Sequence, residues 1–169
     1  MKALLLGVGI ACALGIGHLE ATGYEGVGLM GLVGIFVVPG AGVAYLLWGI
    51  LRRRPRAQQI GAAMVLGAMA GFFVAARIGN RQEQDSRARG DRLAVALDGY
   101  RTAHGDVPGS LQDLVPAFMP AVPPTCMGVF VQRPYFYARL GPSSYRLSFE
   151  TQAWCVCERG AEGGWRVSD

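Results

Sequence analysis

The residues of this sequence best suited to chemistry are three cysteines near its end, Cys126, Cys155 and Cys157, together with His104. Thiolates and imidazoles bind zinc, and a thiol beside an imidazole can act as a nucleophile with its base. No CxxC pair, HExxH helix, Walker loop or Ser-His-Asp set accompanies them. We therefore expect no enzyme, no catalytic residue, no metal site and no cofactor, and we interpret His104 as the end of a helix.

The cysteines favour one structural disulfide. Cys155 and Cys157 are two positions apart in a stretch typical of a strand, so both side chains point to one face and cannot easily bond to each other. In an oxidising compartment we expect one of them to pair with Cys126 and the other to remain a thiol. The sequence leaves open which of the two pairs. Cys12 lies in an apolar run and is interpreted as an inert, small apolar residue.

A glycine motif at residues 26–31, GVGLMG, matches the spacing of a dinucleotide-binding loop. Such a loop binds a pyrophosphate only between a strand and a helix, with an acidic residue about 20 positions later. No strand is predicted before residue 26, and the motif opens a long apolar run. The match therefore predicts no nucleotide site.

Composition indicates that much of the chain lies in a membrane, since 51% of its residues are hydrophobic. Three uncharged runs follow one another at residues 3–19, 26–51 and 57–76. About 20 apolar residues at 1.5 Å each cross a hydrocarbon core of ~30 Å. We therefore predict three transmembrane helices in a membrane domain of residues 1–79, the third helix extending to residue 79. A signal peptide cleaved after Ala21 is the alternative for the first run.

Charge predicts the orientation of these segments. The net charge of +4 belongs to residues 1–79, because residues 80–169 contain ten arginines and ten acidic residues. Basic residues beside membrane segments stay on the cytoplasmic side. We expect the N-terminus inside and residues 80–169 in the periplasm of a bacterium, anchored in its inner membrane. The residues that carry this topology are Arg52, Arg53, Arg54 and Arg56. The alternative role for RRRPR is binding of anionic lipid or nucleic acid, and we expect no nucleic-acid partner.

Small residues recur every four positions in the first and third predicted spans. Such ribbons let helix backbones approach closely, as in GxxxG contacts. We expect these two spans to pack together, although a chain with 25 glycines also produces such ribbons by chance. The predicted packing residues are Ala3, Gly7, Ala11 and Gly15 in the first span and Ala63, Gly67, Gly71 and Ala75 in the third.

The second half, residues 80–169, is predicted to be an α+β domain. Residues 80–92 alternate in charge, which favours a solvated helix leaving the membrane, and a stripe from Leu93 to Tyr100 gives that helix one apolar face. Gly105 is a typical helix stop, and Ser110 with Asp113 resembles a capping box for a short turn. The apolar period then changes to two, which predicts a small antiparallel sheet. Its strands are expected in residues 129–140, 145–149, 154–156 and 165–167.

Two stretches resemble a known family. AVALDGYRTAHGDVPGSLQDLVP and PYFYARLGPSSYRLSFE are similar to type IV pilin-like proteins, in particular the major pseudopilins of type II secretion. The resemblance covers residues 57–169 and is most specific over residues 93–116. It implies a pilin-like fold, in which the third membrane helix continues into the domain as a long helix packed on the sheet.

The chain departs from that family at the processing site. The family has a glycine before the cleaved bond and a glutamate as the fifth residue after it. Here Gly61 would be followed by Leu66 at that position, and Gly71 by Ala76, with two predicted spans before either. We therefore expect an unprocessed, non-enzymatic inner-membrane protein with a pilin-like periplasmic interaction domain. Its expected partners are the lipid bilayer and proteins of a secretion or pilus system. The alternative is a membrane-anchored sensor or ligand-binding module.

Overall fold

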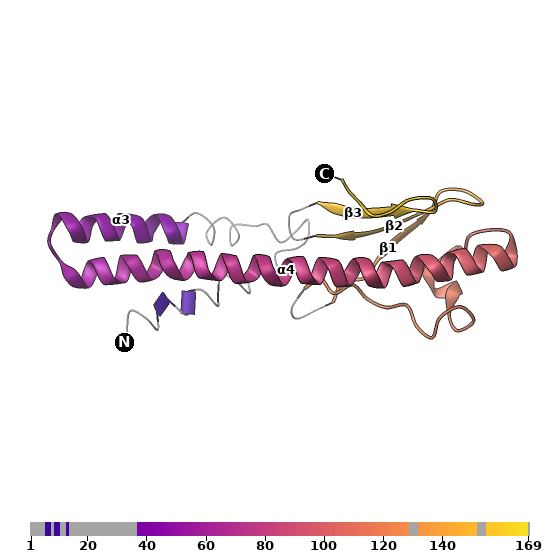
Figure 1. The fold of residues 1–169 in the computed structure, drawn as a ribbon, viewed down its shortest axis with the longest axis horizontal. Helices are drawn as coiled ribbons and strands as arrows, with labels where there is room; N and C mark the ends of the chain where they lie inside the picture. The colour runs from indigo at the N-terminus through magenta and orange to yellow at the C-terminus, as the bar shows by residue number, and fades with distance from the viewer. Residues whose placement is uncertain are drawn as a thin grey trace. The chain divides into compact units, whose positions relative to one another are not determined.

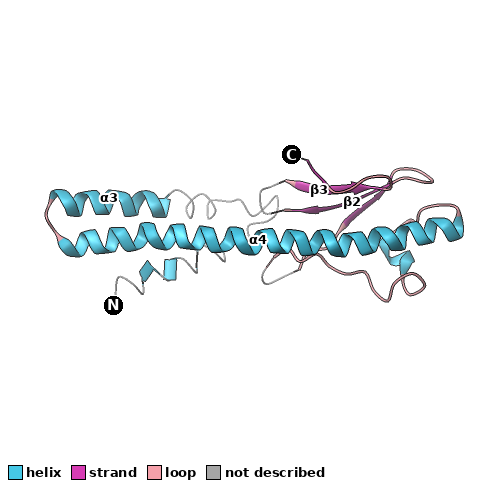
Figure 2. Cartoon of the chain, viewed as in Figure 1, coloured by secondary structure: helices cyan, strands magenta, loops and turns pink. Residues whose placement is uncertain are grey.

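The computed structural model describes residues 6–7, 9–10, 13, 37–128, 132–151 and 155–168. The chain is α+β and divides into two compact units, Met1–Gly79 and Asn80–Asp169 (Figures 1 and 2). The elements are the helices α3 (Val38–Leu51) and α4 (Pro55–His104), the 3-10 helix η2 (Leu111–Leu114) and the strands β1 (Phe136–Arg139), β2 (Tyr145–Glu150), β3 (Val156–Gly160) and β4 (Arg166–Ser168).

The prediction of three transmembrane helices is wrong. Among the described residues, α4 alone has both the length and the apolar composition needed to cross a membrane. The second predicted span, residues 26–51, is helical as α3 over 14 residues, which at 1.5 Å each give about 21 Å against the ~30 Å of a hydrocarbon core. Pro39 lies in the first turn of α3, where its missing N–H costs nothing, so it marks a helix start inside the apolar run. Residues 26–36 and most of the first predicted span, 3–19, lie outside the described residues.

Helix α4 is continuous over 50 residues. After Pro55, which suits a first helical turn, the helix contains no proline that would remove a backbone hydrogen bond. It ends where the sequence predicts, because Gly105 adopts a φ of 77° and its N–H donates to the Arg101 carbonyl at 2.8 Å. One helix therefore contains both the third apolar run and the predicted stripe of the domain.

In the first unit, α3 and the start of α4 form a helical hairpin (Figure 1). Glycines bring the two backbones together: a Cβ added at Gly61 would lie 2.5 Å from the Leu46 nitrogen, and one at Gly49 would lie 2.8 Å from the Gln58 nitrogen. The Gln58 amide also donates to the Gly49 carbonyl at 3.2 Å. Only glycine at these positions permits so close a helix contact.

In the second unit, the four strands form an antiparallel sheet in the order β1-β2-β3-β4. Along β2, Tyr145, Leu147 and Phe149 are buried and Arg146 is exposed, which confirms the predicted alternation of a buried and a wet face. The first strand begins at Phe136, later than predicted. Pro134 cannot donate to a strand ladder, and the Arg133 carbonyl instead accepts the N–H of Thr125 at 2.8 Å.

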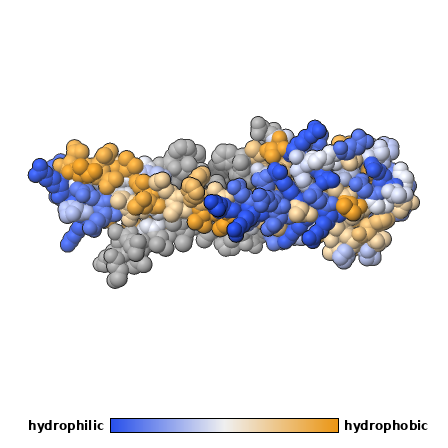
Figure 3. All heavy atoms as spheres, viewed as in Figure 1, coloured by the Kyte–Doolittle hydropathy of each residue, from blue (hydrophilic) through white to orange (hydrophobic). Residues whose placement is uncertain are grey.

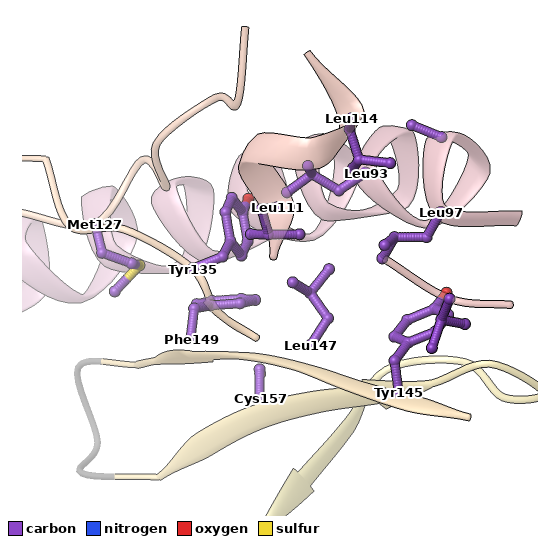
Figure 4. Close-up of a cluster of buried hydrophobic side chains, with 12 residues drawn as sticks. Leu93, Leu97, Leu111, Leu114, Met127, Tyr135, Tyr145, Leu147, Phe149 and Cys157 are labelled. Carbon is purple, nitrogen blue, oxygen red and sulfur yellow. The ribbon is translucent and has the colours of Figure 1, made fainter. Parts of the chain in front are cut away.

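The core of this unit lies between the sheet and the second half of α4 (Figure 4). Leu93 and Leu97 of α4 point toward Leu147 and Phe149 of the sheet, and η2 closes one end. The capping box at η2 is confirmed, since the Asp113 carboxylate accepts the Ser110 N–H at 2.8 Å. The buried cluster comprises Leu93, Ala96, Leu97, Val107, Leu111, Leu114, Met127, Tyr135, Tyr145, Leu147, Phe149 and Cys157.

Candidate functional site

The described cysteines form no disulfide with one another. Cys157 projects from β3 into the core, where the Arg87 guanidinium donates to its sulfur at 3.3 Å. The backbone N–H of Cys126 donates to the Ser86 hydroxyl at 2.9 Å. Cys126 and Cys157 therefore contact neighbouring residues of α4, Ser86 and Arg87. No two of Cys126, Cys155 and Cys157 lie at disulfide distance. The bridge therefore stays a prediction, which mass spectrometry of the non-reduced native protein would test.

The environment of Cys157 favours a thiol over a thiolate. Burial raises the pKa of the Cys157 thiol above its ordinary value, and the neighbouring Arg87 opposes this shift only in part. Glu83 lies 3.7 Å from the sulfur and forms a 2.5 Å ion pair with Arg87, so the guanidinium charge is already compensated. Since the thiolate is the nucleophilic form, this arrangement supports a packing role for Cys157.

His104 is far from these thiols. Its ring stacks on Tyr100 with 4.1 Å between centroids, and its Nδ1 lies 3.1 Å from the Tyr100 carbonyl oxygen. His104 lies 17 positions after Arg87 on α4, which corresponds to about 25 Å at 1.5 Å per residue. The structure therefore does not bring His104 and Cys157 together as base and nucleophile. Within the described ranges, no cluster of three or more His, Cys, Asp or Glu side chains could hold a metal ion.

A groove of about 460 Å³ lies on the second unit. Its walls are residues 109–112 at η2, the loop 122–124, and a third segment at the start of the edge strand β1, of which Gln132, Pro134, Tyr135 and Tyr137 line the groove. Prolines and tyrosines supply much of the lining, among them Pro123, Pro124 and Pro134. Because the three walls come from separate segments of residues 109–137, no local pattern could predict the groove.

The two tyrosine hydroxyls of the groove already serve the fold. The Tyr135 hydroxyl donates to the Ser86 carbonyl at 2.5 Å, and the Tyr137 hydroxyl donates to the Pro108 carbonyl at 2.7 Å. Burial raises the pKa of Tyr137 to about 12, so this side chain stays neutral at physiological pH. The remaining lining residues are glycine, serine, glutamine, leucine, valine and proline. Such a surface suits non-covalent contact with an extended or apolar segment.

Part of the predicted small-residue ribbon lies within the described residues. Gly7 packs on α4, where an added Cβ would be 3.0 Å from the Ala63 carbonyl oxygen, and the backbone of Gly7 also contacts Gly67. Gly71 and Ala75 are buried. Ala3, Ala11 and Gly15 lie outside the described residues, as does Cys12. The contact between α3 and α4 through Gly42, Gly49 and Gly61 was missed, although the seven-residue spacing of the first two is a signal for a packed helix face.

The predicted topology arginines occupy the turn between α3 and α4 and the first turn of α4. All four, Arg52, Arg53, Arg54 and Arg56, are exposed. The guanidinium carbon of Arg54 lies 5.5 Å from the centre of the Trp48 ring, a distance typical of a cation–π contact. The hairpin therefore presents its basic residues to the solvent beside an aromatic side chain.

No family model, no curated protein and no solved structure matches the chain. The resemblance to pilin-like proteins therefore still rests on the two sequence stretches, and most specifically on residues 93–116. A long helix packed on a small antiparallel sheet is not enough to identify a pilin fold.

Proposed function

We propose that this chain is a non-enzymatic membrane protein in which α4 anchors residues 80–169 at the membrane as an interaction domain. The observation that carries the proposal is the change of surface along α4. Its first half exposes large apolar side chains, among them Leu66 (65% exposed) and Phe73 (68% exposed). An apolar surface of this kind typically contacts lipid or another protein. Its second half buries Leu93 and Leu97 in the domain core.

The proposed location is the inner membrane of a bacterium, with α4 as the span. The uncharged stretch of α4 begins directly after Arg56, and RRRPR would remain in the cytoplasm because basic residues resist transfer across the membrane. Residues 80–169, with balanced charge, would then lie in the periplasm.

The proposed role of residues 80–169 is to bind a protein, as an accessory to a secretion or pilus system. The Pro- and Tyr-lined groove beside the edge strand β1 supports a binding role. The resemblance of residues 93–116 to pseudopilins supports the choice of pathway. A sensor or ligand-binding module is the second candidate, because the groove volume of about 460 Å³ lies in the range of small-molecule sites.

A membrane-extraction experiment tests the anchor. The double variant Leu66→Arg/Phe73→Arg should lose most of its retention in membranes after alkaline carbonate extraction, because charge in a span is costly. Val95→Arg is the matched control, since Val95 is also an exposed apolar residue of α4 (72% exposed) but lies in the second unit. Equal retention of both variants would contradict the anchor.

A deletion strain tests the pathway. Loss of the gene should reduce export of secreted enzymes or assembly of pili, and re-expression of the full chain should restore it. Normal export and piliation in the deletion strain would contradict a secretion role and would favour the sensor.

A further inference from the structure

The turn between α3 and α4 concentrates positive charge that no acidic side chain of the described residues pairs. Arg52, Arg53, Arg54 and Arg56 lie within five residues and are all exposed. None of the ion pairs in the described part of the chain includes them. The first turn of α4 contains no acidic residue. Blue spheres accordingly gather at this end of the hairpin (Figure 3). An anion bound here would relieve the mutual repulsion of the four guanidinium groups.

Apolar and aromatic side chains border this charge on the α3 side. Leu51, directly before Arg52, is 80% exposed. Trp48 and Tyr45 are partly exposed and stack with 5.5 Å between their ring centroids. Indole and phenol rings favour the boundary between lipid headgroups and acyl chains. The hairpin end therefore combines groups that prefer the membrane interface with groups that bind phosphate.

The backbone holds these groups in place. The Arg54 N–H donates to the Gly49 carbonyl at 2.8 Å, and the Gln58 side chain donates to the same carbonyl at 3.2 Å. These bonds fix the turn against the end of α3, where Arg54 lies over Trp48. A turn whose backbone is already fixed loses less backbone freedom when it binds a ligand.

From this juxtaposition we propose that the α3–α4 turn binds the phosphate groups of anionic phospholipids. The guanidinium groups of Arg52, Arg53, Arg54 and Arg56 contact the headgroup phosphates in forked pairs of hydrogen bonds. Trp48 and Leu51 contact the adjoining glycerol and acyl region. Lipid fits better than nucleic acid, because a nucleic acid would leave the exposed Leu51 and neighbouring Ile50 without an apolar partner. The inference rests on the proposed membrane anchor.

The test uses the full-length protein in a neutral detergent. Native mass spectrometry would compare retention of phosphatidylglycerol with retention of phosphatidylcholine. We expect the wild-type protein to prefer the anionic lipid, and Arg52→Gln/Arg54→Gln/Arg56→Gln to weaken that apparent affinity by about tenfold or more. Arg81→Gln/Arg92→Gln/Arg166→Gln is the matched control, because it removes the same charge from exposed positions of the second unit and should leave the preference unchanged.

Further arms identify the ligand. Replacing the same three turn arginines by lysine should preserve most of the preference, and circular dichroism should give unchanged helix content for all variants. Equal retention of the two lipids by the wild-type protein would overturn the proposal. An unchanged preference in the glutamine variant would also overturn the proposal, whether that variant is folded or misfolded, because the preference would then not need the turn. Competition by millimolar inorganic phosphate as strong as that by phosphatidylglycerol would identify a simple anion site. Tighter binding of a short DNA duplex would identify nucleic acid instead, and either result contradicts the lipid site.

Membrane retention of the same variants separates this inference from the anchor. Both the wild-type protein and the glutamine variant could stay in carbonate-washed membranes while neither prefers the anionic lipid. In that case the lipid site fails and the anchor stands. If the wild-type protein is extracted by carbonate, the anchor itself fails.

Discussion

The two halves of α4 place their side chains in opposite ways. In the first half, small residues such as Gly61, Ala68 and Ala75 are buried, while large residues such as Leu66 and Phe73 are exposed. In the second half, large residues are buried under the sheet and charged ones face outward. Small residues inside and large residues outside are typical of helices packed in lipid, and the reverse is typical of a soluble domain. The position of the large residues, and not hydrophobicity alone, distinguishes the two environments.

The largest expected effect comes from truncating one phenylalanine in each of the two units. Phe149→Ala, in the core of the second unit at 1% exposure, should lower the free energy of unfolding of that unit by about 3–5 kcal/mol. Phe73→Ala, on the exposed side of α4, should change it by less than about 0.5 kcal/mol. Urea unfolding followed by near-ultraviolet circular dichroism measures both. Equal losses would remove the contrast between the two units.

A smaller loss of stability is expected when a glycine is enlarged at the contact between α3 and α4 in the first unit. Gly61→Ala places a Cβ against the Leu46 backbone and should destabilise the hairpin by about 1–3 kcal/mol. Gly40→Ala in α3 is the control, because an added Cβ there meets no atom within 4 Å. Thermal unfolding in detergent, followed by circular dichroism, reports the difference. A larger shift for the control would mean that α3 and α4 do not pack through Gly61.

The smallest expected effect comes from removing the Tyr137 hydroxyl in the second unit. Tyr137→Phe removes the bond to the Pro108 carbonyl and should cost about 1 kcal/mol at neutral pH. Because burial raises the pKa of Tyr137 from 10.0 to about 12, the unfolded chain loses this proton first as the pH rises. The contribution of the neutral hydroxyl is therefore complete below pH 10 and is lost between about pH 10 and 12. Unfolding midpoints measured across this range should fall less steeply for the variant than for the wild-type protein.

Local chemistry in the second unit could be predicted from sequence. The stop at Gly105, the capping box at Ser110 and Asp113 and the alternation along β2 each depend on neighbouring residues, and the structure contains all of them. The groove could not be predicted in this way, because η2, the loop 122–124 and the segment before β1 meet only in the folded chain.

The first unit was harder to predict from sequence. An apolar run of 26 residues gave no internal sign of where a helix begins, apart from Pro39, which the structure places in the first turn of α3. Hydropathy counts apolar residues and does not report which glycines contact a neighbouring backbone. The close approach of Gly49 and Gly61 across the α3–α4 hairpin therefore became evident only from the structure.

The most direct test of the account places one spin label at Phe73 and another at Val95 in the full-length protein reconstituted in lipid bilayers. Both side chains are largely exposed on α4, at 68% and 72%. We predict that the label at Phe73 collides with oxygen, which concentrates in lipid, and is shielded from a water-soluble nickel chelate. The label at Val95 should show the reverse. If both labels collide equally with the nickel chelate, the first half of α4 does not lie in lipid and the account is contradicted.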